Sequence, residues 1–291
     1  MLRRLAMMGL VAALLGAAAI LLLRPDLPER QLAGLTGDAK HGAYLARLGG
    51  CFGCHTDAKG GGKVLAGGAG IETPFGTFYG PNITMHEGDG IGAWTFEEFA
   101  RAVAEGVSPE GNRYFPVFPY AHYSRLSDQD LADLWAAFQT VPPVAGKGPA
   151  NDVGFPFNQR ILMGPWNAMF AEFGPLDRDS SRSDSWSRGR FLAEGPGHCG
   201  ACHTPRNLFG GLRRSAAFVG GTGPDSEEVP AITRNALLAA GYDKDELALA
   251  LKTGLTPEGD SLGGSMGEVV SGSTRFWSGD DLRAIAAYLL E

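Results

Sequence analysis

Two short motifs contain every cysteine of this sequence. Each motif reads Cys-x-x-Cys-His, and together they use all four cysteines of the chain. Their members are Cys51, Cys54 and His55 in the first motif, and Cys199, Cys202 and His203 in the second. Two thiols on one helical turn can reach the two vinyl groups of one haem, and the histidine that follows can bind its iron. We therefore predict two covalently attached haem c groups, with both histidines as iron ligands.

Two other uses of the cysteines explain less of the pattern. A disulfide within each pair leaves the histidine after both pairs unexplained, and no thioredoxin-type βαβ pattern surrounds either pair. Four thiolates could close one tetrahedral zinc site. A zinc site of this kind would give neither histidine a role. It would also require the two cysteine pairs, 148 residues apart, to bind the same metal ion.

The sequence around the second motif repeats the sequence around the first. The two motifs start 148 residues apart, and SPEG at residues 108–111 matches TPEG at residues 256–259 with the same offset. PNIT at residues 81–84 echoes PAIT at residues 230–233, one residue out of phase. An internal repeat of this length indicates two similar domains in tandem.

The helical signals are also repeated. Each half ends in an apolar stripe with helical spacing, and Ser127 and Ser278 are expected to cap these two helices. Thr95 and Glu98 form a predicted capping box for an earlier helix. No stretch alternates over enough residues to predict a sheet. The sequence therefore predicts an all-α fold of two small domains, each built around a haem that supplies part of its core.

A sixth iron ligand is expected in the second domain. A thioether is a common choice for electron transfer because it raises the reduction potential. Met266 lies 67 residues after Cys199, and no other methionine lies beyond residue 169. The same spacing in the first domain leads to Phe118, which cannot bind iron.

The N-terminus carries a long apolar run. Residues 5–23 are 19 consecutive uncharged residues, preceded by Arg3 and Arg4. A helix of this length spans roughly 28 Å, close to the hydrocarbon thickness of a bilayer. The alternative is a cleaved signal peptide, but the sequence after the run is a poor cleavage site. We predict an uncleaved anchor in the inner membrane, crossing once, with the remaining chain on the periplasmic side.

The net charge argues against one class of partner. The chain has 25 Lys and Arg against 32 Asp and Glu, a formal net charge of -7. Binding to phosphate backbones needs clustered cations. We therefore expect no nucleic-acid partner.

Further short motifs surround the two cysteine motifs. They are GAYL (residues 42–45), LAGG (65–68), TPFGT (73–77), PNIT (81–84), GIGAWT (90–95), FPFN (155–158) and CGACHTPRN (199–207). With them the chain resembles, from Gly42 onward, the membrane-bound multi-haem cytochrome c subunits of bacterial periplasmic dehydrogenases for alcohols, aldehydes, gluconate and related substrates. The resemblance implies class I cytochrome c domains and a dehydrogenase partner.

The chain departs from this family in two respects. Family members commonly carry three haems, and this sequence has two motifs. They also typically read Met-Pro-Tyr where this chain has Phe118-Pro119-Tyr120, the methionine being the sixth ligand of the first haem. The sixth ligand of the first iron is therefore open among several candidates. Met163 is the preferred candidate and His122 is its rival. The remaining candidates are Met85, His86 and an iron with no sixth ligand.

Four other residues are expected to support the haems. A proximal histidine normally donates its second ring N–H to a backbone carbonyl. By resemblance to class I cytochromes, Pro81 supplies this carbonyl in the first domain and Pro230 in the second. Trp94 and Arg206 are candidate contacts of the haem propionates.

The predicted organisation is a transmembrane anchor (1–24), a first cytochrome c domain (25–146), a connector packed on the first domain (147–180) and a second cytochrome c domain (181–291). The predicted function is electron transfer by a membrane-tethered carrier. It would link a periplasmic dehydrogenase or quinol-oxidising complex to a downstream cytochrome or a respiratory oxidase. The alternative is a di-haem enzyme, a peroxidase or sulfur-compound oxidoreductase, with an open first haem.

Overall fold

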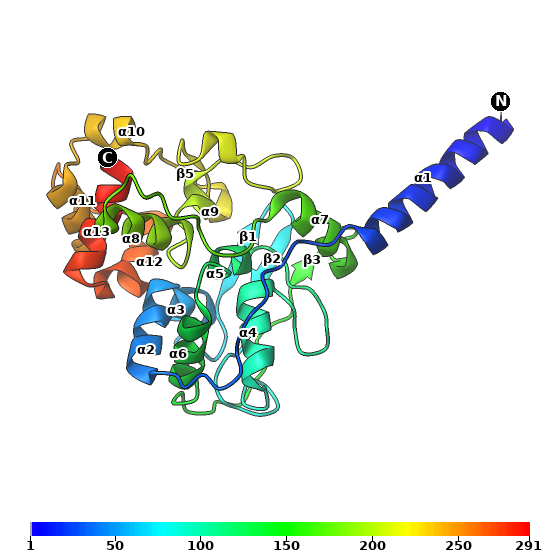
Figure 1. The fold of residues 1–291 in the computed structure, drawn as a ribbon, viewed down its shortest axis with the longest axis horizontal. Helices are drawn as coiled ribbons and strands as arrows, with labels where there is room; N and C mark the ends of the chain where they lie inside the picture. The colour runs from blue at the N-terminus through cyan, green and yellow to red at the C-terminus, as the bar shows by residue number, and fades with distance from the viewer. Residues whose placement is uncertain (1) are drawn as a thin grey trace.

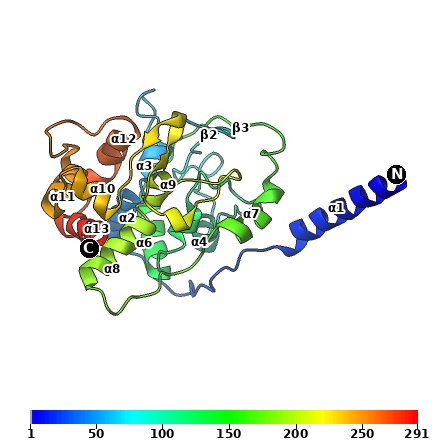
Figure 2. The same cartoon turned by 90° about the horizontal axis from the view of Figure 1, so that it is seen from above.

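The computed structural model describes residues 2–291, except the side chains at positions 2, 6, 12, 19–22 and 225. Helix α1 (Leu2–Leu22) extends away from the rest of the chain, which forms one body (Figures 1 and 2). The two cysteine motifs lie in this body, on the short helices α3 (Cys51–His55) and α9 (Gly200–His203).

Helix α1 covers most of the apolar run at residues 5–23, for which a membrane anchor is predicted. Arg3 and Arg4 lie inside the first turns of this helix and are exposed, so the charges expected before a spanning segment are part of it. Among the described residues, no helix combines the length and the apolar character that crossing a membrane requires. The predicted transmembrane anchor over residues 1–24, of which Met1 lies outside the described residues, is therefore wrong. The predicted single-pass location in the inner membrane is wrong for the same reason.

The first half is held together by two packed helices. Its remaining helices are α2 (Ala39–Leu48), α4 (Phe96–Glu105), α5 (Tyr120–Tyr123) and α6 (Asp128–Phe138). Helices α2 and α6 pack at Gly42, where an added Cβ would overlap the carbonyl oxygen of Asp133. Only glycine allows this close approach. The predicted caps are confirmed, since Ser127 caps α6 and Thr95 forms a capping box with Glu98.

The second half repeats this arrangement. Its remaining helices are α8 (Asp184–Glu194), α10 (Arg234–Ala239), α11 (Lys244–Thr253), α12 (Gly264–Gly272) and α13 (Gly279–Leu290), with the 3₁₀ turns η2 (Arg214–Ala216), η3 (Pro224–Ser226) and η4 (Thr274–Phe276). Helices α8 and α13 pack at Gly189, where an added Cβ would overlap the carbonyl of Ala284. Ser278 caps α13 as predicted.

Five short strands among the described residues show that the predicted all-α fold is wrong. They are β1 (Gly70–Thr73), β2 (Gly76–Tyr79), β3 (Asp152–Val153), β4 (Gly221–Thr222) and β5 (Glu228–Val229). Strands β1 and β2 form an antiparallel hairpin with Thr73 opposite Gly76, and β3 adds to β2. Strands β4 and β5 pair separately. Strands of two to four residues are too short to show the alternation on which strand prediction depends.

The two halves share a core and a polar contact. Buried residues of both belong to one hydrophobic cluster, which includes Leu48 from α2 and Leu192 from α8. At its edge the Tyr44 hydroxyl donates a hydrogen bond of 2.7 Å to Asp281. Asp281 also accepts two hydrogen bonds from the Arg188 guanidinium, at 2.8 and 2.9 Å. The two halves therefore pack against each other as one unit and are not independent domains joined by a linker.

The connector contains the 3₁₀ turn η1 (Arg160–Leu162) and helix α7 (Met163–Phe170) and contacts both halves. The Tyr120 hydroxyl donates to Asn167 Oδ1 at 2.8 Å, and Trp166 Nε1 donates to the Phe209 carbonyl at 2.7 Å. The boundaries predicted at 25–146, 147–180 and 181–291 stay predictions.

Candidate functional site

The first motif occupies a single helical turn that begins after Gly50. Gly50 adopts a left-handed conformation with φ of 64°, which lets the chain turn sharply from α2 into α3. His55, at the end of the turn, has its Nδ1 2.7 Å from the carbonyl oxygen of Pro81. Because a carbonyl only accepts, Nδ1 carries the proton, and Nε2 keeps its lone pair for a metal. Desolvation lowers the pKa of His55, which favours this neutral form.

The second motif has the same geometry. His203 Nδ1 lies 2.8 Å from the Pro230 carbonyl oxygen, so Nε2 is again the nitrogen free to bind a metal. Desolvation also lowers the pKa of His203. The structure thus places Pro81 and Pro230 in equivalent positions beside the two histidines.

The thiols suit thioether bonds better than a disulfide or a zinc site. All four cysteines are free in the described structure. Desolvation raises the pKa of Cys51 and of Cys199 to about 12. A zinc site needs thiolates, which this environment disfavours, whereas a thioether leaves the sulfur uncharged. The donor set therefore fits covalent haem.

A hydroxyl after each motif fixes the loop that leads to the proline. Thr56 Oγ1 accepts a hydrogen bond from the Leu65 N–H at 3.0 Å, and the Leu65 carbonyl accepts one from Ile83. Thr204 and Phe218 repeat the first contact at 3.1 Å. Leu65 and Phe218 both adopt left-handed conformations, with φ of 59° and 62°. Neither threonine was predicted to hold this loop, although a threonine follows both motifs.

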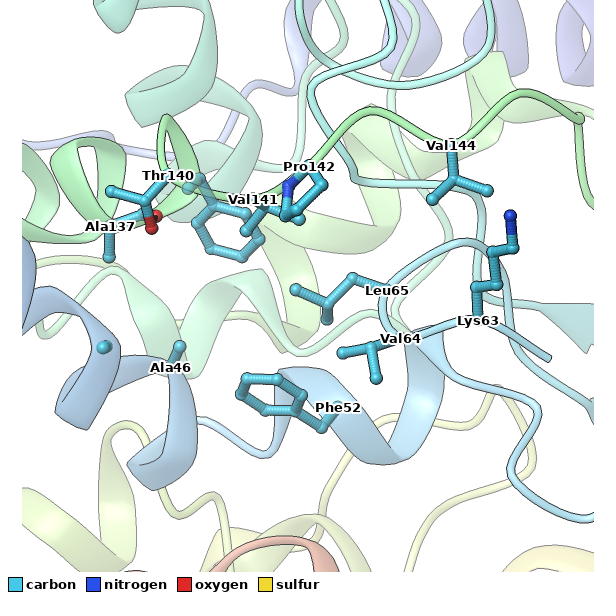
Figure 3. A pocket seen from close by; sticks show the side chains of 12 residues that line it. Ala46, Phe52, Lys63, Val64, Leu65, Ala137, Thr140, Val141, Pro142 and Val144 are labelled. Carbon is cyan, nitrogen blue, oxygen red and sulfur yellow. Dashed lines mark hydrogen bonds between the residues drawn. The ribbon is translucent and has the colours of Figure 1, made fainter. Parts of the chain in front are cut away.

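An apolar pocket of about 440 Å³ adjoins the first motif. Phe52, the residue after Cys51, lies across it from Val141 and Pro142, with Leu65 between them (Figure 3). These side chains make one flank of the motif apolar.

The loops that lead to the expected sixth ligands match residue for residue. The Tyr114 N–H donates to the Gly106 carbonyl at 2.7 Å, and the Leu262 N–H donates to the Gly254 carbonyl at 2.7 Å. Tyr114 and Leu262 are 148 residues apart in the sequence, and Gly106 and Gly254 are separated by the same number. The two loops therefore correspond as far as Tyr114 and Leu262. Four residues later the first loop has Phe118 and the second has Met266.

Phe118 and Met266 have different surroundings. Phe118 lies in an aromatic cluster, with ring centroids 5.6 to 6.2 Å from those of Tyr114, Tyr120 and Tyr123. Met266 is half-buried in α12, a helix that contacts α3 of the first half. An ion pair between Lys59 and Glu268, 2.7 Å apart, also joins these two regions. The role of Met266 as an iron ligand stays a prediction.

The other candidate ligands of the first iron lie in three environments. Met85 packs against the shared core, and Met163 is half-buried at the start of α7. His86 Nδ1 accepts the N–H of Asp89 at 3.0 Å, which leaves the proton on Nε2. A ring in that form has no free lone pair for a metal.

His122 faces the second half of the chain. Its Nδ1 lies 2.8 Å from the Glu194 carbonyl oxygen, and its ring centroid lies 6.3 Å from that of His198. His122 is thus tied to the end of α8. The choice among Met163, His122, Met85 and no ligand remains a prediction.

The two expected propionate contacts are placed differently. Trp94 packs half-buried against the core of the first half. Arg206 donates to the carbonyls of Ala201 and Gly210, both at 2.8 Å, and so braces the loop after the second motif. Its contact with a propionate stays a prediction.

The chain is similar in sequence to known cytochromes c. No protein-family model matches the chain. It is 42% identical over 282 residues to a protein of Cereibacter sphaeroides named "Diheme cytochrome c-type", covering 94% of this chain and 93% of that protein. It is 41% identical over 250 residues to a nicotinate dehydrogenase subunit of Pseudomonas putida, covering 86% of this chain and 21% of that protein.

A further relative is the cytochrome c subunit of the quinone-dependent alcohol dehydrogenase of Gluconobacter oxydans. It is 39% identical over 259 residues, which cover 86% of this chain and 54% of that subunit. The chain therefore spans about half the length of this subunit and a fifth of the nicotinate dehydrogenase subunit. These relatives confirm the resemblance and both predicted haems: the chain belongs to the family of dihaem cytochromes c and dehydrogenase cytochrome c subunits, and it carries covalently bound haem c.

Proposed function

We propose that this protein is the electron-transfer subunit of a dehydrogenase and passes electrons through its two haems to a downstream cytochrome or oxidase. Relatives named as subunits of alcohol, fructose, gluconate and nicotinate dehydrogenases support a dehydrogenase as the donor. Haem supplies the ability to gain and lose single electrons. The chain supplies the positions of the two irons.

One observation carries this proposal, namely the closeness of the two haem-attachment turns. A Cβ on Gly50, which precedes Cys51, would lie 3.9 Å from Nε2 of His198, which precedes Cys199. Helix α12, which carries Met266, packs on α3. Two redox groups attached to adjoining turns of one packed body can exchange electrons without any domain motion.

The residues around each histidine prepare it for this role. The carbonyls of Pro81 and Pro230 fix the ring orientation and the protonated nitrogen, and desolvation keeps His55 and His203 neutral. An iron held by a fixed imidazole changes its surroundings little when its charge changes.

The donor can be identified by substrate-dependent reduction. The oxidised dihaem protein is mixed with extract of its native host, and ethanol, fructose, gluconate or nicotinate is added separately. We expect one substrate to reduce both haems, as read from their visible spectrum, and heat-treated extract to reduce neither. The proposal fails if ascorbate reduces the haems while no dehydrogenase substrate does so.

A second candidate function rests on Phe118. If the aromatic cluster leaves the first iron without a sixth ligand, the protein could act on a small molecule there, as a di-haem peroxidase does. Carbon monoxide separates the two functions, because an open ferrous iron binds it at once. We expect slow binding in the wild type and faster binding in Met163→Ala or His122→Ala, whichever removes the ligand. Fast binding to the wild type, with turnover of peroxide, would favour the enzyme.

A further inference from the structure

The two haem-attachment turns meet at Tyr123. The Gly49 carbonyl, two residues before Cys51, accepts a hydrogen bond of 2.6 Å from the Tyr123 hydroxyl. The ring of Tyr123 also lies edge-to-face with the imidazole of His198, with ring centroids 6.0 Å apart. Tyr123 belongs to the first half, whereas His198 immediately precedes Cys199 in the second. Tyr123 thus links the turn of its own half to a side chain of the other half.

His198 is held in a conformation that few side chains adopt. Its φ is 37°, in the left-handed region that is unfavourable for a residue with a side chain. Its ring centroid lies 6.0 Å from that of Tyr123 and 6.3 Å from that of His122, both in edge-to-face arrangements. A strained residue persists only where its surroundings fix it. The turn before Cys199 is therefore shaped so that this ring reaches the first half.

We propose that His198 is a positioning residue, which fixes the second haem-attachment turn against the first and thereby sets the rate of electron exchange between the two haems. The inference rests on the proposed function. The route from Cys51 to Cys199 runs through the backbone to Gly49, the hydrogen bond from Tyr123, and the edge-to-face contact between Tyr123 and His198. The exchange moves one electron from the reduced iron to the oxidised iron, and no bond to His198 forms or breaks.

A purely structural part for His198 would have different consequences. Removing a packed aromatic ring lowers stability wherever it lies. Removing this one should also let the two turns move apart, which changes the exchange rate and the relative orientation of the haems. These two readouts distinguish positioning from packing.

The experiment compares three variants of the full haem-loaded protein. His198→Leu removes the aromatic ring, and His198→Phe keeps an aromatic ring at the same position. His41→Leu is the control, since it removes an imidazole that pairs with Asp133 at 2.7 Å, in a contact that includes neither haem-attachment turn. Laser-flash reduction followed by relaxation of the electron between the haems gives the rate. Electron paramagnetic resonance gives the orientation.

We expect His198→Leu to slow relaxation about fivefold, the equivalent of about 1 kcal/mol for one edge-to-face ring contact. His198→Phe should keep most of the rate, and His41→Leu should lower the melting temperature without changing the rate. If His198→Leu fails to take up both haems, His198→Phe decides alone: a rate near that of the wild type supports the proposal. An unchanged rate in a folded His198→Leu, or a slowed His198→Phe, overturns it. Either result leaves reduction by the dehydrogenase, and so the proposed function, intact.

Discussion

In the first half, His55 Nδ1 lies 2.7 Å from the Pro81 carbonyl, and in the second half His203 Nδ1 lies 2.8 Å from the Pro230 carbonyl. The threonine after each motif and the left-handed residue that it anchors are repeated as well. The loops toward the expected sixth ligands also match, until Phe118 takes the position that corresponds to Met266. The two halves thus hold the proximal ligand alike and differ in the side chain expected opposite it.

This comparison shows which part of a haem site can change without changing the fold. The proximal side depends on backbone carbonyls and on a tight turn, so its geometry is fixed by the chain itself. The opposite side depends on one side chain at the end of an unchanged loop. A single substitution there can alter the reduction potential or the ligand binding of one iron and leave the other as it was.

The largest effect should come from removing one attachment motif. Cys199→Ala combined with Cys202→Ala leaves a second haem no thiol to bond, so the protein should carry one haem instead of two. The pyridine haemochrome assay measures this loading, and the matching pair Cys51→Ala with Cys54→Ala should give the same halving. Finding one haem or none in the wild type would contradict the assignment.

The next effect concerns the sixth ligands. Met266→Ala should abolish the near-infrared absorption band of methionine-ligated ferric haem and lower the potential of the second haem by a fraction of the ~0.8 V range that axial ligands span. Phe118→Met should add such a band for the first haem and make the halves alike. Potentiometric titration followed by absorption spectroscopy checks both changes. If the band is still present in Met266→Ala, the methionine that binds the iron is not Met266.

The glycines at the two helix crossings should matter equally. Gly42→Ala and Gly189→Ala each place a Cβ on a backbone carbonyl of the facing helix, so each should lower the free energy of unfolding by about 1–3 kcal/mol or more. Gly272→Ala is the control, because nothing lies within 4 Å of its added Cβ. Denaturant unfolding measures all three. A large loss in one half alone would show that the crossings are not equivalent.

The smallest expected effect is a dependence of stability on pH. Burial raises the pKa of Asp281, but hydrogen bonds from Arg188 and Tyr44 outweigh it and hold the pKa below its usual value. Because the folded pKa is lowered, Asp281 stabilises the protein above its unfolded pKa, and this stability is lost as the pH falls through the folded pKa. Asp281→Asn should cost about 1–2 kcal/mol at neutral pH and little in acid, as thermal melting over pH can show. An equal loss at both pH values would mean that the charge is not involved.

Much of the site could be predicted from local sequence, and most of what was missed is long-range. The cysteine motifs and the helix caps at Ser127 and Ser278 are patterns within a few residues, and such patterns have one local solution. The β1–β2 hairpin was missed because its strands have four residues each. The contact between His198 and Tyr123 joins residues far apart in the sequence, so no local pattern predicts it.

The interface between the halves, with the Tyr44–Asp281 contact at its edge, has a consequence for how the protein unfolds. Each half buries part of its apolar surface against the other at this interface. Neither half can therefore unfold while the other keeps its full structure. Heating should therefore produce a single cooperative transition, reported alike by the absorption of both haems. A half expressed alone would expose the surface that the other half normally covers. Exchanging halves between relatives therefore requires matching residues at the interface between the halves as well as around the two irons.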